Sequence, residues 1–149
     1  MSLHEYRFRS DWFIPAPVDR VYDALEDLAC YPRWWREVKE AEPLSEGACL
    51  LTCRATLPYD LVFTTTQARR DRDAGVLEAR MTGDLDGFSR WTIRRSGTGT
   101  LAVFEEEVEA TKRLLRFLAP VARPVFRLNH WLMMHHGRSG LREYLSPGQ

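Results

Sequence analysis

The sequence predicts an α+β domain in which an antiparallel sheet is followed by a long C-terminal helix, and three observations predict it. An alternating segment at the N-terminus ends at Pro15 and Pro17 and is followed by an amphipathic stretch. Residues 48–112 keep a period near two, which is typical of strands. After Arg113 the period changes to 3.6, which is typical of a helix. We therefore expect a strand, a short helix, a meander of strands and a long helix, in that order.

The first element is predicted to be a half-buried strand over residues 4–14. Its apolar positions all fall on one side of a period-two pattern: Tyr6, Phe8, Trp12 and Ile14. The other side carries charged residues. Such a strand packs one face on a core and exposes the other to water.

The second element is predicted to be a helix over residues 17–28. Pro15 and Pro17 cannot donate to a sheet ladder, and Pro17 suits the first turn of a helix. Apolar residues then recur at helical spacing: Val18, Val21, Tyr22, Leu25 and Leu28. Residues 31–35, which read Y-P-R-W-W, form a short irregular or helical segment, and residues 37–44 are predicted to be a second strand.

Five further strands are expected in the meander, at residues 48–57, 60–70, 75–83, 87–96 and 100–112. Turn-forming residues separate them, so successive strands pair as hairpins. One face is expected to be wet and the other dry. In the last strand, period two places Glu106 on the dry face between Phe104 and Val108.

The C-terminal helix is predicted to begin at Pro120 and to end near Tyr144, after a short helical piece at 114–118. At about 100° per residue, four arginines share one arc, which we assign to water: Arg123, Arg127, Arg138 and Arg142. The opposite arc is predicted to be buried, and it holds Val125, Asn129, Leu132, Met133, His136 and Gly140, with Phe126, Gly137 and Tyr144 at its edge. Gly137 and Gly140 each cost about 1 kcal/mol against alanine inside a helix, which predicts a close approach of another element or room for a ligand.

Length and charge favour a single domain at residues 1–146 with a loose tail at 147–149. Lys and Arg number 21, as do Asp and Glu, so the net charge of zero argues against nucleic acid as a partner. The N-terminus lacks the apolar core of a signal peptide, and no apolar run approaches the roughly 20 residues that span a bilayer. We expect a cytoplasmic protein without integral membrane association.

Neither a metal nor a cofactor is predicted. The histidines His4, His130, His135 and His136 have no metal-site spacing backed by carboxylates on one face, and nucleotide-binding motifs are absent. The three cysteines, Cys30, Cys49 and Cys53, are interpreted as buried thiols in preference to a metal or redox site.

Four sequence segments are informative together: W-F-I-P-A-P-V-D-R-V-Y-D-A-L-E-D from Trp12, W-W at Trp34, E-G-A at Glu46 and N-H-W-L-M-M-H-H-G-R-S-G-L-R-E-Y-L from Asn129. They carry a resemblance to the START-like (SRPBCC) superfamily, which includes polyketide cyclase/dehydrase-type and birch-pollen-allergen-type (Bet v 1-like) proteins. This resemblance implies a helix-grip fold, in which a curved seven-stranded antiparallel sheet wraps around the long helix and two short helices lie between strands 1 and 2. It also implies a cavity between sheet and helix for an apolar or amphipathic small molecule.

Within that fold, the residues expected to contact a ligand are Trp91, Phe104, Glu106, Asn129, Met133, His136, Met81 and Trp34. Glu106 and His136 are the candidate acid–base residues, since a polar residue on a buried face needs a partner. Other interpretations stay open at this stage. Glu106 suits a structural salt bridge, His136 a backbone carbonyl, and Trp34 a place in the core.

Three functions remain open from the sequence. The first is binding of an apolar, aromatic or lipid-like small molecule. The second is a metal-free polyketide aromatase/cyclase or dehydratase-like activity that uses the cavity acid and base. The third is a helper protein that binds a quinone or a partner chain at a membrane, which only the four arginines of the last helix support. The sequence leaves open whether the protein is a monomer or a homodimer.

Overall fold

The computed structural model describes residues 5–45, 47–54, 60–111 and 119–146. Within these residues, seven strands and three helical segments follow one another. They are β1 (Glu5–Ile14), α1 (Val18–Glu26), the 3-10 helix η1 (Leu28–Arg33), β2 (Val38–Ser45), β3 (Ala48–Cys53), β4 (Leu61–Asp71), β5 (Val76–Gly83), β6 (Leu85–Ser96), β7 (Gly99–Ala110) and α3 (Ala119–Tyr144).

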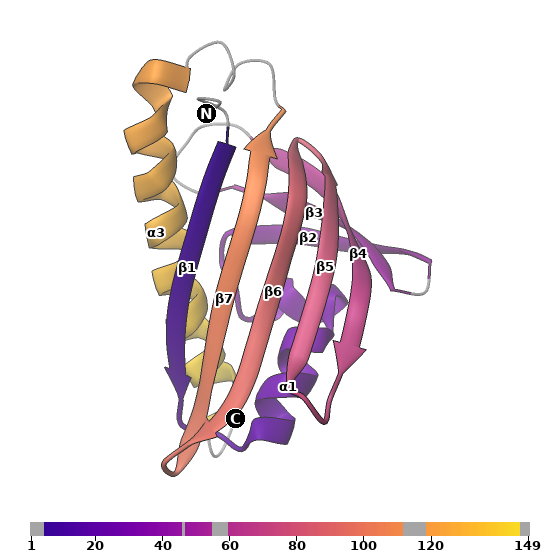
Figure 1. The fold of residues 1–149 in the computed structure, drawn as a ribbon, viewed down its shortest axis with the longest axis vertical. Coiled ribbons are helices and arrows are strands. Elements are labelled where there is room, and N and C mark those ends of the chain that lie inside the picture. The colour runs from indigo at the N-terminus through magenta and orange to yellow at the C-terminus, as the bar shows by residue number, and fades with distance from the viewer. Residues whose placement is uncertain (1–4, 46, 55–59, 112–118, 147–149) are drawn as a thin grey trace.

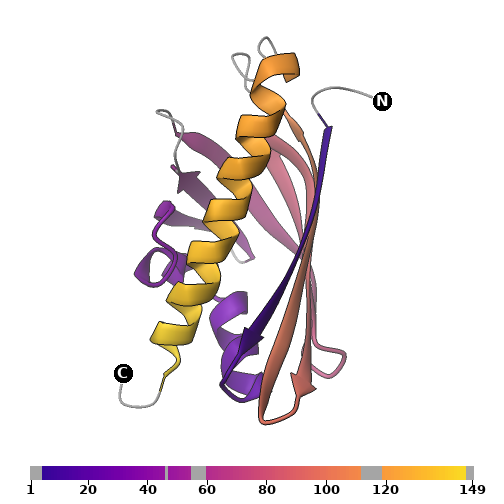
Figure 2. The same cartoon turned by 90° about the vertical axis from the view of Figure 1, so that its left-hand side faces the viewer.

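The strands form one antiparallel sheet in the order β1-β7-β6-β5-β4-β3-β2. Every neighbouring pair except β1–β7 is a hairpin of consecutive strands, so only that pair joins distant parts of the chain. The sheet curves around α3, while α1 and η1 lie on the same side of it (Figures 1 and 2). This is the helix-grip fold that the sequence predicts.

With one exception, the predicted element boundaries agree with the structure to within two residues wherever both ends are described. The exception is the short segment predicted at 31–35, which is the 3-10 helix Leu28–Arg33 and begins three residues earlier. The first helix is shorter than predicted because the chain changes to 3-10 geometry at Leu28. The predicted helical piece at 114–118, the end of the strand at 48–57 and the tail at 147–149 lie outside the described residues.

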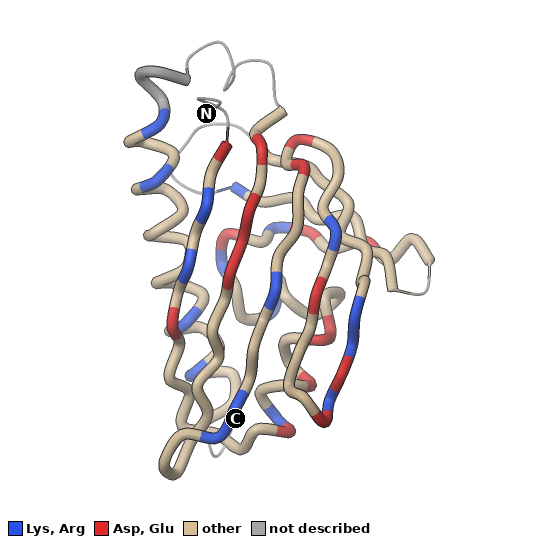
Figure 3. Tube along the Cα trace, viewed as in Figure 1, with Lys and Arg blue, Asp and Glu red and all other residues tan. Residues whose placement is uncertain are grey.

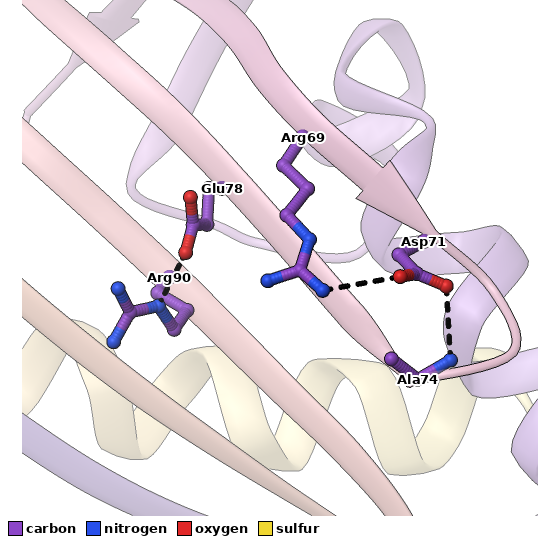
Figure 4. A network of polar contacts seen from close by, with 5 residues as sticks. All are labelled: Arg69, Asp71, Ala74, Glu78 and Arg90. Carbon is purple, nitrogen blue, oxygen red and sulfur yellow. Dashed lines mark hydrogen bonds and ion pairs between the residues drawn. The ribbon is translucent and has the colours of Figure 1, made fainter.

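The convex face of the sheet carries ion pairs both between neighbouring strands and within a strand. Arg90 Nε lies 2.7 Å from Glu78 Oε1 and links β6 to β5. On β4, Arg69 lies 3.1 Å from Asp71, whose other carboxylate oxygen accepts the Ala74 backbone N–H (Figure 4). The pKa of the Asp71 carboxyl is held below its usual value, mainly by the hydrogen bond from the Ala74 N–H and to a smaller extent by Arg69. Alternating charges of this kind along the strands are visible in Figure 3 and confirm the predicted wet face.

The aromatic core lies where η1 meets α3. Trp12 contacts both Trp34 and Trp35 edge-on, with ring centroids 6.3 and 5.4 Å apart, and all three indoles are buried. A Cβ atom added to Gly137 would lie 2.6 Å from the Trp35 ring, and one added to Gly140 would overlap the Trp34 carbonyl oxygen. The two glycines therefore allow close helix-to-core contact, which is one of the two predicted reasons for them.

Trp35 also uses the space above Gly137 to form a hydrogen bond. Its indole Nε1–H donates to the Met133 carbonyl oxygen at 2.8 Å. That carbonyl lies one helical turn before Gly137, and the missing side chain leaves it open to the indole. The bond fixes η1 against the middle of α3.

The predicted orientation of α3 is wrong by roughly a quarter of a turn. The residues buried against the sheet and η1 are Phe126, Asn129, Met134, Gly137, Leu141 and Leu145. The predicted core residue Val125 is 45% exposed. The prediction failed because it took the arginines as markers of bulk water.

Two of these arginines instead reach along the edge strand β1. Arg123 donates to the Glu5 carbonyl oxygen at 2.9 Å and Arg142 to that of Phe13 at 2.8 Å. An edge strand presents unpaired backbone groups, and long arginine stems can lie on apolar surface while their heads reach such acceptors. These two arginines therefore lie beside the contact between α3 and the sheet. The face of α3 that carries Val125 lies beyond them and points away from the sheet.

Candidate functional site

A cavity of about 120 Å³ lies between the concave face of the sheet and α3. Its walls are mostly apolar. The sheet contributes Leu51, Phe63, Leu77, Met81, Trp91, Phe104 and Val108, the helix contributes Phe126, Asn129, His130, Met133 and Met134, and η1 with its flanks contributes Leu28, Tyr31 and Trp35.

The free space lies opposite a row of inward-facing residues whose two middle members, Ser89 and Ala79, are small. Strand register aligns Glu106 on β7 with Ser89 on β6, Ser89 with Ala79 on β5, and Ala79 with Gln67 on β4. All four residues line the cavity. The neighbouring row pairs the large rings of Trp91 and Phe104. Small residues beside large ones therefore leave a hollow in the middle of the sheet.

Glu106 and His130 form a buried polar pair at one end of this row. His130 Nε2 lies 3.1 Å from Glu106 Oε1, and the side chains are only 14% and 9% exposed. An Nε2–H in this position donates to the carboxylate. The imidazole also stacks on Phe8 of β1, with ring centroids 3.6 Å apart. Packing and hydrogen bonding together hold the imidazole in one orientation.

This arrangement places a proton donor and acceptor in a mostly apolar space. A histidine beside a carboxylate is a common acid–base unit, and each group forms stronger hydrogen bonds where water is scarce. The same pair can bind a hydroxyl or carbonyl group of a ligand. The cavity is therefore equipped both for polar anchoring and for proton transfer.

Six of the eight predicted ligand residues line the cavity: Met81, Trp91, Phe104, Glu106, Asn129 and Met133. Their placement agrees with the sequence pattern, and their contact with a ligand remains a prediction. Trp34 and His136 are absent from the described lining. Trp34 packs in the core, stacked on Trp35 with ring centroids 5.3 Å apart, and it is Trp35 that reaches the cavity.

His136 points to a different carboxylate. Its Nδ1 lies 2.5 Å from Oε2 of Glu37, a buried residue between η1 and β2. The rotated helix face explains this placement, because it turns His136 away from the cavity and brings His130 to it. A joint acid–base role for Glu106 and His136 has no support from this geometry.

Replacing His136 by alanine is expected to destabilise the protein by about 2 kcal/mol, because the buried Glu37 carboxylate loses its partner. Urea unfolding monitored by circular dichroism measures the change. His135→Ala provides the control, since that neighbouring imidazole is exposed. Adding Glu37→Gln to His136→Ala should recover part of the loss. Equal unfolding midpoints for the two single variants would contradict this account.

Sequence reasoning missed His130, Ser89 and Ala79. A signal for His130 was present in the spacing of the buried positions 126, 130, 134, 137, 141 and 145, which recur every three or four residues. His130 and Gly137 are the only non-apolar members of that series. Ser89 and Ala79 gave no signal, because only strand register brings them beside Glu106.

The cysteines are free thiols, and Cys49 and Cys53 are buried as predicted, whereas Cys30 is only partly buried. Burial raises the pKa of Cys53, which lines the cavity, to about 12. Its thiol is therefore neutral and unreactive near neutral pH. Tyr31 also lines the cavity, and burial raises its pKa while its hydroxyl donates to the Leu25 carbonyl oxygen at 2.6 Å.

Among the described residues no cluster of three or more histidine, cysteine or carboxylate side chains is arranged to hold a metal ion. No helix in the described part of the chain is long and apolar enough to cross a membrane.

Comparison with solved structures shows the same fold in proteins of low sequence identity. A protein from Thermus thermophilus is 18% identical, with a TM-score of 0.75 over 95% of this chain and 100% of the other. The Zhui aromatase/cyclase from a Streptomyces species is 13% identical, with a TM-score of 0.76 over 95% and 94%. A START superfamily protein from Mycobacterium smegmatis is 16% identical, with a TM-score of 0.72 over 95% and 97%.

At the level of sequence, no curated protein matches this chain. A protein family does match, over residues 14–130, which run from the end of β1 to His130 in α3. The matched region contains the whole meander and most of the cavity lining. The chain therefore belongs to the family described as polyketide cyclase / dehydrase and lipid transport.

Proposed function

We propose that this protein binds a small, mostly apolar molecule with one hydroxyl or carbonyl group in the cavity between the sheet and α3. The observation that carries the proposal is the Glu106–His130 pair, which is a buried hydrogen-bonding pair at one end of a mostly apolar space. Apolar walls favour transfer of the ligand from water, and the pair orients its polar group.

The size of the cavity narrows the ligand class. A volume of about 120 Å³ is close to that of an engineered cavity of roughly 150 Å³ that admits benzene. It is well below the roughly 300 Å³ at the lower end of typical pockets for drug-sized ligands. A single ring or a short chain therefore fits this conformation, whereas a complete lipid or a multi-ring polyketide requires α3 and the sheet to move apart.

Wild-type protein is expected to bind p-cresol more tightly than toluene, because only p-cresol offers a hydroxyl to the Glu106–His130 pair. The affinity for p-cresol should be about fivefold higher, which corresponds to the net free energy of roughly one hydrogen bond. Ala79→Leu fills the space beside Ser89 and should weaken p-cresol binding at least tenfold. Saturation-transfer NMR and calorimetric titration measure both effects.

Ala74→Leu is the matched control, since Ala74 lies exposed in the β4–β5 turn and should leave affinity unchanged. Absence of binding to wild-type protein, or equal binding to both leucine variants, would show that the cavity is not the site.

A second function, metal-free acid–base chemistry on a ketone, is supported by the orientation of His130. In such a reaction the imidazole or the carboxylate removes a proton from the carbon beside a carbonyl, and the resulting enolate attacks a second carbonyl before water is lost. The similarity of fold to an aromatase/cyclase agrees with this candidate. The fold alone does not assign the activity.

Deuterium exchange at the α-carbon of cyclohexanone tests this second function with a substrate that has the size of the cavity. Wild-type protein should accelerate the exchange, and Glu106→Gln and His130→Gln should each abolish the acceleration. His135→Gln should leave it unchanged. If neither cavity variant differs from wild type, the protein binds without catalysis of this kind.

A further inference from the structure

The face of α3 that points away from the cavity is apolar over residues 125–131. Val125, Leu128 and Trp131 are 45%, 58% and 61% exposed, and we call them the outer stripe. They recur every three residues, so they follow one side of the helix over two turns. The ring of Trp131 stacks on the exposed His135 one turn further on, at 5.4 Å between ring centroids. Isolated exposed apolar residues are ordinary, whereas a continuous stripe that includes a tryptophan indicates a contact surface.

The sequence around the outer stripe is strongly basic although the whole chain is neutral. Between Glu109 and Glu143 it contains no Asp or Glu, and its seven basic residues are Lys112, Arg113, Arg116, Arg123, Arg127, Arg138 and Arg142. The remainder of the chain accordingly has 14 basic residues against 21 acidic ones. Positive charge is therefore concentrated in the segment that carries the outer stripe.

The arginines of α3 form a row along one flank of the stripe. The bonds from Arg123 to the Glu5 carbonyl and from Arg142 to the Phe13 carbonyl hold this row beside β1. The result is a helix with an apolar outer face and a cationic flank, which is the pattern of helices that lie in the interface of an anionic membrane.

Other partners fit this surface less well. In a symmetric pair of copies with antiparallel helices the same patch faces itself, so the arginine row of one copy would lie on the same side as that of the other. A nucleic acid would pair with the arginines but would leave Val125, Leu128 and Trp131 without apolar contact. A lipid surface satisfies both halves of the pattern, since tryptophan favours the headgroup region and arginine favours anionic lipids.

We propose that the outer stripe of α3 docks this protein on a membrane surface that contains anionic lipids. The opposite face of the same helix, through Phe126, His130 and Met134, forms a wall of the cavity. Docking therefore places the cavity about one helix diameter, roughly 10 Å, from the bilayer. An apolar ligand then has a short path between the two.

Trp131 is a built-in reporter of docking. The chain has five tryptophans, and the other four, Trp12, Trp34, Trp35 and Trp91, are buried. With the full-length protein, vesicles of phosphatidylcholine containing one-third phosphatidylglycerol should shift the tryptophan emission to shorter wavelength. Pure phosphatidylcholine vesicles should shift it far less. Raising the salt to about 0.15 M should weaken the effect several-fold, because exposed charges are screened.

Vesicle co-sedimentation of paired variants tests whether the outer stripe itself causes membrane binding, or whether exposed apolar residues anywhere on the protein do so. Leu128→Gln/Trp131→Gln should lose at least tenfold in affinity, while Leu44→Gln/Val62→Gln, which replaces exposed apolar residues on β2 and β4, should bind as wild type does. Arg127→Gln should lose about fivefold, the usual contribution of one arginine near an anionic surface, and the exposed Arg94→Gln should lose nothing.

Three results would overturn the proposal. One is failure of the wild-type protein to bind phosphatidylglycerol vesicles at low salt. Another is equal loss of binding in the two double-glutamine variants. The third is a dimer, seen by analytical ultracentrifugation, that Leu128→Gln/Trp131→Gln dissociates, because the outer stripe would then be covered by a second copy.

Discussion

Replacing Gly140 by alanine is expected to cost about 3 kcal/mol or more in the free energy of unfolding. The added Cβ would occupy the position of the Trp34 carbonyl oxygen, which is backbone and cannot rotate away. Relief requires α3 to move from η1, and inserting a single carbon into a packed contact typically costs about 1–3 kcal/mol even where side chains yield. Alanine is more favourable than glycine inside a helix by about 1 kcal/mol. Any net loss of stability in Gly140→Ala must therefore come from the contact with Trp34, because helix propensity alone would stabilise the variant.

Ser139→Ala is the matched control in the same turn, since Ser139 is exposed and alanine there should be neutral or slightly stabilising. Urea unfolding of both variants, followed by circular dichroism and by tryptophan fluorescence, measures the difference. If Gly140→Ala unfolds at the same urea concentration as Ser139→Ala, α3 does not pack against Trp34 in solution as described.

The second large effect is expected from His130→Ala, which should destabilise the protein by about 3 kcal/mol. It leaves the Glu106 carboxylate buried without its hydrogen-bond partner, and breaking a buried pair from one side is usually costly. It also removes the ring stacked on Phe8. Glu106→Gln should cost less than about 1 kcal/mol, because the amide oxygen still accepts the imidazole N–H.

A double-mutant cycle distinguishes this pair from ordinary packing. His130→Ala/Glu106→Leu should be more stable than His130→Ala alone, since the orphaned carboxylate is gone. The cycle is measured by unfolding in the absence of ligand. Additive losses would indicate that Glu106 and His130 do not interact, and the polar anchor of the proposed site would then be lost as well.

The fold was predictable because its signals are local. Alternation in residues 4–14 and 100–110, proline at 15 and 17, and turn residues between strands each depend on neighbours in sequence. The inward placement of Glu106 followed from the same alternation, which a twisted but regular strand preserves.

The face of α3 was predicted wrongly because charge is a poor guide where an edge strand lies nearby. Arg123 and Arg142 satisfy carbonyl groups of β1, a contact between residues far apart in sequence. The apolar series through Phe126, Met134 and Leu141 was the better signal. It was overlooked because the arc opposite the arginines also holds apolar residues, among them Val125, Leu132 and Met133.

The cavity was predictable as a consequence of the fold but not in its details. Its hollow depends on Ala79 and Ser89 lying in one row with Glu106, and the row exists only once strand register is known. Its acid–base pair depends on the rotation of α3. For the same reason sequence reasoning chose His136, which lies one and a half turns beyond His130 and faces Glu37.

The central claim is that the cavity between the sheet and α3 receives the ligand with its polar group at Glu106 and His130. The most direct test is a crystal structure of the protein with p-cresol. We expect the ring between Ala79, Trp91 and Met133, with its hydroxyl within hydrogen-bond distance of Glu106 or His130. A structure in which p-cresol occupies another site, such as the groove between Arg20 and Leu145, while this cavity stays without ligand, would contradict the account.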